Sequence, residues 1–271
     1  MTSWLVLIES NTSGTGRLFV RKAIDCGLRP ILLASDPARY PYTSEEKGEV
    51  LQIDTQNEQL LVQACERLAE SGALVGITTS SEYFIVTAAR LARHFHLPAL
   101  YPQIIESCRN KARLCQHLQA AGVPVPRFQE VTSTREAIEA AQRIGFPVVL
   151  KPVNGTGSGG VKCCRALHDV EEQATQLLQQ RRNERGLPIP HHLLVEEMLC
   201  GPEYSVETFG ETIIGITHKH LGPLPFFVET GHDYPAQLAV SLTAQIQEVA
   251  QKALRALEYR WGPAHAASTA V

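Results

Sequence analysis

Short apolar runs alternate with helically spaced apolar positions along roughly the first hundred residues. Consecutive apolar residues predict strands, as from Trp4 to Ile8, whereas apolar residues that recur every three or four positions predict helices, as over 58–70. The predicted strands are 4–8, 30–34 and 73–78, and the predicted helices are 17–26, 58–70 and 85–95. Because strands alternate with helices, we expect a parallel sheet with helical crossovers, which is a Rossmann-like lobe.

The rest of the chain predicts a second region of mixed helices and strands, so the fold class is α/β. A helix over 110–120 ends at Gly122, and the proline-rich segment 123–126 is typical of a stiff extended linker. Ser133 and Glu136 have the spacing of a capping box, in which the Glu136 side chain reaches back to the Ser133 amide. Further helices are predicted over 133–144, 169–182 and 238–257, and strands over 146–151, 161–166, 191–199, 204–209 and 212–218.

Composition and charge narrow the class of protein. With 271 residues, 44% of them hydrophobic, the chain is long enough for two or three lobes with buried cores. A net charge of −3 offers no basic field for nucleic acid, and no apolar run approaches the roughly 20 residues of a membrane helix. The seven cysteines are scattered and form no paired zinc motif, so we expect no metal site from them and a reduced, cytoplasmic protein.

A glycine-rich segment follows the predicted strand 146–151. It satisfies G-x-G-x-x-G through Gly155, Gly157 and Gly160, although glycines also build ordinary turns. The residues after it favour a strand, whereas a dinucleotide fingerprint needs a helix there, and Val161 stands where a P-loop would have its lysine. We therefore predict a strand–loop–strand flap whose amides cover phosphates. Its residues are Gly155, Thr156, Gly157, Ser158, Gly159 and Gly160.

Two neighbouring segments supply the rest of a nucleotide site. Lys151 ends a buried strand and needs an anionic partner, either nucleotide phosphates or, as the structural alternative, Glu196 or Glu197. The main chain of Glu197, Met198 and Leu199 is suited to reading an adenine edge, and the Glu203 carboxylate to accepting ribose hydroxyls. Taken alone, Glu196 and Glu197 are equally compatible with solvated charge.

Together these motifs resemble the ATP-grasp superfamily. The matching segments are 110–113, 146–152, 155–160, 195–199 and 201–207, in the family's order and spacing over nearly the whole chain. The resemblance implies ATP as cofactor, Lys111 and Lys151 on its phosphates, and Glu196 with the 197–199 backbone on adenine. It also implies a pre-ATP-grasp domain over 1–104, a linking helix over 105–126, a small lid lobe over 127–199 and a large lobe over 200–271.

The distal half is similar to the branch of bacterial L-amino-acid (dipeptide) ligases and carnosine-synthase-like enzymes. Segments 226–235 and 261–265 carry this resemblance. It implies that ATP phosphorylates a small carboxylate and that an amine attacks the acyl phosphate. Glu229 and His232 would then lie beside the amino-acid substrate, with Glu82 and Tyr83 lining the same pocket from the first lobe. The alternative for His232 is a turn histidine that caps a backbone group.

The end of the chain departs from that branch. The family carries a magnesium-binding glutamate after the Gly262–His265 motif, and then a second acidic ligand and an arginine, whereas this chain reads Ala266 to Val271. Mg²⁺ is thus expected from the family while its protein ligands are absent, and no catalytic residue is assigned. We therefore interpret the chain as a shortened ligase. The alternatives are a catalytically dead nucleotide-binding protein and an ATP-grasp carboxylase, and a homodimer is left open.

Overall fold

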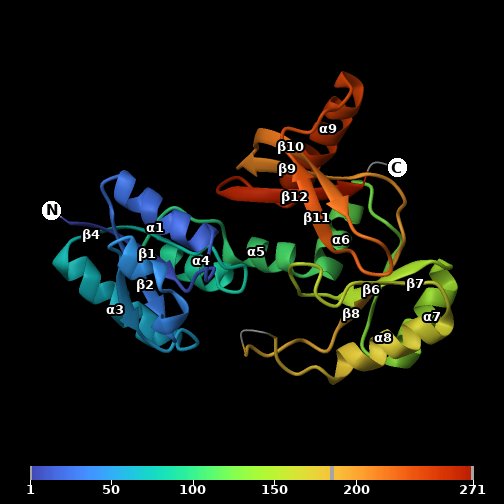
Figure 1. The fold of residues 1–271 in the computed structure, drawn as a ribbon, viewed down its shortest axis with the longest axis horizontal. Coiled ribbons are helices and arrows are strands. Elements are labelled where there is room, and N and C mark those ends of the chain that lie inside the picture. The colour runs from blue at the N-terminus through green and yellow to red at the C-terminus, as the bar shows by residue number, and fades with distance from the viewer. Residues whose placement is uncertain (1, 184–185, 270–271) are drawn as a thin grey trace. The chain divides into compact units, whose positions relative to one another are not determined.

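The computed structural model of the protein describes residues 2–183 and 186–269. The chain divides into two compact units, Met1–Ile105 and Glu106–Val271, each with its own buried apolar residues (Figure 1). Within the described ranges, every helix is too short or too polar to cross a membrane.

The first unit is a parallel sheet with strand order β3-β2-β1-β4 and helices in the connections. Val6, Leu7 and Ile8 at the end of β1 are fully buried, as expected for a parallel strand covered on both faces. This confirms the predicted Rossmann-like arrangement. Its elements are β1 (Ser3–Ile8), α1 (Thr15–Asp25), β2 (Arg29–Ala34), η1 (Pro37–Arg39), α2 (Tyr42–Glu45), β3 (Glu49–Gln52), α3 (Glu58–Ser71), β4 (Ala73–Thr78) and α4 (Ile85–His94), and α5 (Pro102–Arg109) contains the boundary between the units.

The second unit begins with α6 and an antiparallel sheet of order β5-β8-β6-β7. Helices α7 and α8 lie side by side against this sheet (Figure 1), and their alanines and leucines bury Val148, Leu150 and Val195. The elements are α6 (Lys111–Ala120), β5 (Phe128–Val131), α7 (Thr134–Ile144), β6 (Val148–Pro152), β7 (Lys162–Cys164), α8 (Leu167–Gln179) and β8 (Leu193–Glu197).

The cap of α7 differs from the prediction in one contact. The Ser133 hydroxyl accepts from the Glu136 amide at 3.2 Å, as a capping box requires. The Glu136 carboxylate, however, accepts from the amide and hydroxyl of Thr132 at 2.7 and 3.0 Å. The acidic side chain therefore closes the turn one residue earlier than expected, because Thr132 offers two donors.

The second unit also contains an antiparallel sheet of order β11-β10-β9-β12. Its apolar face, with Tyr204, Val206 and Ile216, packs against Ile246 and Ala250 of α9. The elements are β9 (Glu203–Phe209), β10 (Thr212–Leu221), β11 (Glu229–Asp233), α9 (Val240–Ala256) and β12 (Pro263–Thr269).

Three boundaries in this unit correct the sequence prediction. The strand predicted over 212–218 continues to Leu221, and the strand predicted over 191–199 is only Leu193–Glu197. The helix predicted over 169–182 is Leu167–Gln179. Strands β5, β11 and β12 were not predicted. The finer division into a lid lobe (127–199) and a large lobe (200–271) stays a prediction.

Candidate functional site

The glycine loop joins two antiparallel strands. Strand β6 pairs with β7 in the register Val148↔Cys164 to Leu150↔Lys162, and the loop between them turns through Gly157, Ser158 and Gly160 at positive φ. The predicted strand–loop–strand hairpin is therefore confirmed, and no helix follows the loop as a dinucleotide fold would need.

Gly160 is the glycine of this loop with the strictest steric requirement. Its φ is +74°, and a Cβ there would lie 2.8 Å from Leu177 Cδ2 and 3.1 Å from two Pro152 carbons. We expect Gly160→Ala to lower the free energy of unfolding by about 2 kcal/mol, from backbone strain and overlap together. Urea denaturation measures this loss.

Gly155→Ala is the matched control, because Gly155 has no positive φ and its added Cβ would have only Gly159 O nearby, at 3.8 Å. This variant should change the free energy of unfolding by less than about 1 kcal/mol. Equal losses in the two variants would contradict the steric account of the loop.

Lys151 and Lys111 lie at the base of the loop with partners of their own. The Lys151 ammonium is paired with the Glu196 carboxylate, which the structural alternative anticipated, and both side chains are largely buried. Lys111 begins α6, where its Nζ donates to Gly155 O at 2.9 Å and its amide donates to Val153 O. Two cations thus stand beside the glycine loop, and their contact with phosphates stays a prediction.

The chain leaves the sheet at the end of β8, and residues 197–199 at this point are the ones predicted to bind adenine. The Glu197 side chain pairs with Arg127 at 3.1 Å, and its amide donates to Arg127 O. The Arg127 guanidinium holds the pKa of the Glu197 carboxyl below its usual range. The Met198 amide points to Pro147 O at 3.4 Å, whereas among the described residues the Leu199 amide has no hydrogen-bond acceptor. Leu199 is therefore the backbone donor of this segment that remains available to a base.

A cavity of about 210 Å³ lies beside this segment. Met198 and Leu199 form one part of its wall, and Glu203 lines it where β9 begins. The cavity combines apolar walls with a carboxylate, as a pocket for a base and sugar would. The full lining is Met198, Leu199, Cys200, Gly201, Glu203, Leu221, Gly222, Leu224, Phe227 and Thr269.

Lys219 connects the predicted nucleotide and substrate residues, and the sequence did not single it out. Its side chain, 8% exposed, is paired with Glu203 across β9–β10 and with Glu229 at 2.6 Å toward β11. The register explains these contacts, since Lys219 lies directly opposite both Glu203 and His232. His232 Nε2 in turn lies 2.9 Å from Glu229 Oε2. These four residues, Glu203, Lys219, Glu229 and His232, are called the Lys219 cluster below.

The hydrogen bonds within the Lys219 cluster shift the pKa values of Lys219 and Glu229. Burial alone would lower the pKa of Lys219, but its hydrogen bonds to Glu203 and Glu229 outweigh that effect, and the pKa is raised. The same hydrogen bond holds the pKa of Glu229 below its ordinary value, with a smaller contribution from His232. At neutral pH the Lys219 ammonium therefore lies beside an ionised Glu229 carboxylate.

The predicted substrate residues fall in different units. His232 lies in strand β11 and contacts a side chain, so its interpretation as a turn histidine that caps the backbone is wrong. Glu82 belongs to the first unit, where it is an exposed residue of the turn before α4. The grouping of Glu82 with Glu229 and His232 stays a prediction.

The described residues on the Lys219 face of this sheet do not fit Mg²⁺. Glu203 and Glu229 are held by Lys219, and Glu207 faces His265 Nδ1 at 2.9 Å and accepts from Ser205. Mg²⁺ in nucleotide sites is usually held by one or two carboxylates together with waters and phosphates, and these three described carboxylates each already have a protein partner.

A known protein family accounts for this combination of glycine hairpin, paired lysine and antiparallel sheet. The model of the ATP-grasp domain matches residues 144–268. Residues 144–268 are an ATP-grasp domain. The match runs from the strand before the glycine loop to β12 and includes Lys151, Glu196 and the Lys219 cluster.

Related proteins extend the ATP-grasp similarity beyond the matched segment. The uncharacterized protein y4rH of Sinorhizobium fredii is 40% identical over 263 residues, which are 97% of this chain and 54% of that protein. Alanine–anticapsin ligase of Bacillus amyloliquefaciens is 27% identical over 194 residues, covering 70% of this chain and 41% of the enzyme. The chain therefore spans about half the length of the curated relatives that it matches.

Solved structures show the same fold. L-amino acid ligase from Bacillus licheniformis superposes with a TM-score of 0.79 at 22% identity, covering 99% of this chain and 63% of that one. An ADP complex of N5-carboxyaminoimidazole ribonucleotide synthetase gives a TM-score of 0.77 at 16% identity, covering 100% and 67%. At these identities the likeness establishes the ATP-grasp fold alone.

Proposed function

We propose that this chain carries the ATP site and the amino-acid site of an ATP-dependent carboxylate–amine ligase. The observation that carries the proposal is the position of Glu203. It lines the cavity beside Met198 and Leu199, and it also pairs with Lys219, which holds Glu229. A single ion-pair network thus joins the wall of the 210 Å³ cavity to a carboxylate suited to an amino acid's ammonium group.

The nucleotide would occupy the cavity and the glycine hairpin. Adenine would accept a hydrogen bond from the Leu199 amide. Glu203 would accept hydrogen bonds from the ribose hydroxyls while it remains paired with Lys219. The Lys151 ammonium, now paired with Glu196, would bind phosphate oxygens of the nucleotide instead. Both partners are anionic, and the lysine side chain is flexible. The loop amides at 155–160 would close over the phosphates.

The amino-acid substrate would be held at Glu229. An ammonium group can replace Lys219 as the partner of this carboxylate, because Glu229 is more exposed than Lys219, with side-chain exposures of 38% and 8%. A displaced Lys219 would remain beside Glu203 and would neutralise negative charge on the transferring phosphoryl group.

The reaction would proceed in two steps. The substrate carboxylate oxygen attacks the γ-phosphorus of ATP, the bond to the β-phosphate oxygen breaks, and an acyl phosphate and ADP result. The neutral amine then attacks the acyl carbon, the bond to phosphate breaks, and an amide and inorganic phosphate are released. His232, hydrogen-bonded to Glu229, is placed to take the proton that the amine loses.

Release of ADP in the presence of amino-acid pairs tests this proposal. Because the chain spans about half of its relatives, the assay is run on the 271-residue chain and on full-length y4rH, of which this chain covers 54%. We expect amino-acid-dependent ADP release, reduced at least about tenfold by Glu229→Gln, because a hydrogen bond to a charged ammonium contributes about 1.5–3 kcal/mol. Glu211→Gln, in the exposed turn between β9 and β10, is the matched control.

Absence of ADP release by both chains with every amino-acid pair would contradict the ligase assignment. ATP binding without turnover in both would favour a nucleotide-binding protein instead. Turnover that depends on bicarbonate and not on an amine would favour a carboxylase.

A further inference from the structure

Strand β10 presents different chemistry on its two faces. Successive residues of a strand point to opposite sides, so Lys219 lies on one face while His218 and His220 lie on the other. The face of His218 is the one that packs toward α9, because His218 lies opposite Tyr204, whose ring belongs to that core. The two histidines are therefore separate from the Lys219 cluster.

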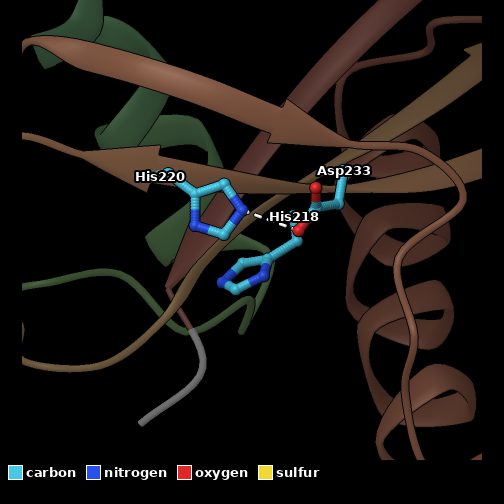
Figure 2. Close-up of side chains that lie close together, drawn as sticks. All are labelled: His218, His220 and Asp233. Atoms are coloured by element: carbon cyan, nitrogen blue, oxygen red, sulfur yellow. Dashed lines mark hydrogen bonds and ion pairs between the residues drawn. The ribbon is translucent and has the colours of Figure 1, made fainter.

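A carboxylate from the neighbouring strand completes the group. Asp233 of β11 is directly paired with His218 in the register, and its Oδ2 lies 2.7 Å from His220 Nε2. Figure 2 shows the His220 ring facing the Asp233 carboxylate, with the His218 ring beside them. One ligand atom from each of the three side chains lies within 4.8 Å of the others.

Packing holds this group together. The His218 ring contacts the Tyr204 ring at a centroid distance of 5.0 Å and the His220 ring at 4.5 Å, with the ring planes tilted by 32° and 58°. Gly231 lies opposite His220, so no cross-strand side chain covers that ring from β11. Asp233 and His220 keep side-chain exposures of 65% and 43%, which leaves an open approach from solvent.

Two imidazoles and one carboxylate form a donor set typical of zinc and related transition metals. Zn–N and Zn–O bonds are about 2.0–2.2 Å long, so ligand atoms around a tetrahedral ion lie about 3.3–3.6 Å apart, and the 2.7 Å contact of His220 with Asp233 would open to admit it. Mg²⁺ and Ca²⁺ prefer sets made of oxygen atoms and would be poor occupants. The exposed side would leave a coordination position for water.

We propose that His218, His220 and Asp233 bind a divalent transition-metal ion of the zinc type on the face of the sheet opposite Lys219. The ion would cross-link β10 to β11, the strand whose other face carries Glu229 and His232. Occupancy would therefore restrain the strand that holds the proposed substrate residues. The proposal does not depend on ligase activity.

Binding of Co²⁺ and Zn²⁺ to the purified 271-residue chain tests the site. Co²⁺ absorption reports the ligand type, and calorimetry with Zn²⁺ gives affinity and stoichiometry. We expect one ion per chain with nitrogen and oxygen ligands, Zn²⁺ affinity reduced at least about tenfold by Asp233→Asn and by His220→Asn, and a higher unfolding temperature with Zn²⁺. Asp233 is exposed, so its variant retains the packing around Tyr204 and His218.

His168→Asn is the matched control, because His168 is an exposed histidine of α8 beside Asp169. It should bind Zn²⁺ as the unmodified chain does. The site is refuted by absence of saturable binding to the folded chain, by a cobalt spectrum with thiolate bands from the free cysteines, or by equal affinities of the control and the Asp233→Asn variant. In each of these cases the group is a hydrogen-bonded His220–Asp233 pair with the His218 ring beside it.

Discussion

Replacement of Lys219 by methionine is expected to destabilise the second unit by about 2–3 kcal/mol. Methionine keeps much of the side-chain length, but it leaves Glu203 and Glu229 facing one another without the cation that both contact. Breaking a buried ion pair costs about 3–5 kcal/mol, and the partial exposure of the two carboxylates reduces this loss. Urea denaturation measures the change.

Lys252→Met is the control for this variant. Lys252 pairs with Glu248 one turn earlier on α9, and both side chains are more than half exposed, so its loss should cost less than about 0.5 kcal/mol. Adding Glu229→Gln to Lys219→Met should recover part of the stability, because it removes one of the two uncompensated charges. Equal stabilities of the two lysine variants would show that Lys219 does not hold the cluster together.

Replacement of Lys151 by alanine is expected to weaken ATP binding about 100-fold. A charge-assisted hydrogen bond contributes about 1.5–3 kcal/mol, and Lys151 is the cation at the end of β6, where the glycine loop begins. Isothermal titration calorimetry with ATP measures the affinity, and urea denaturation confirms that the variant is folded.

Lys162→Ala is the matched variant. Lys162 lies on β7 of the same hairpin, but it pairs with Glu172 of α8 and shares the face of Leu150, which is opposite to that of Lys151. We expect its ATP affinity to stay within about threefold of the unmodified chain, a change of under about 1 kcal/mol. If both variants bind ATP as the unmodified chain does, the only role of Lys151 is its salt bridge to Glu196.

The elements with strong local patterns were predictable. The strand that contains Lys151 is an uninterrupted apolar run, and the residues after the glycine loop are β-formers, so the hairpin follows from neighbouring residues alone. The ATP-grasp resemblance rested on these same short segments. For that reason the family could be predicted, whereas the internal contacts of the site, apart from the anticipated pairing of Lys151 with Glu196, could not.

Lys219 shows what local patterns miss. The apolar run of β10 ends near His218, and three polar residues in a row predict the end of a strand. The strand continues because Glu203 and Glu229, from strands on either side, neutralise the Lys219 ammonium. The residues that compensate this charge are brought together only by the sheet.

Strand β12 was missed for a related reason. Residues 263–269 are small, with a proline and three alanines, and have weak β-propensity. They form a strand because seven consecutive residues pair with β9. Backbone hydrogen bonds to an existing edge outweigh weak local preference, and the sequence pattern does not reveal that edge.

Calorimetric titration of the unmodified chain with ATP, with and without Mg²⁺, tests whether the chain binds this nucleotide. The predicted result is saturable binding of one ATP per chain, weakened about 100-fold in Lys151→Ala and retained in Lys162→Ala. Absence of saturable ATP binding by the folded 271-residue chain under both conditions would contradict the nucleotide site formed by Lys151, the glycine loop and Glu203.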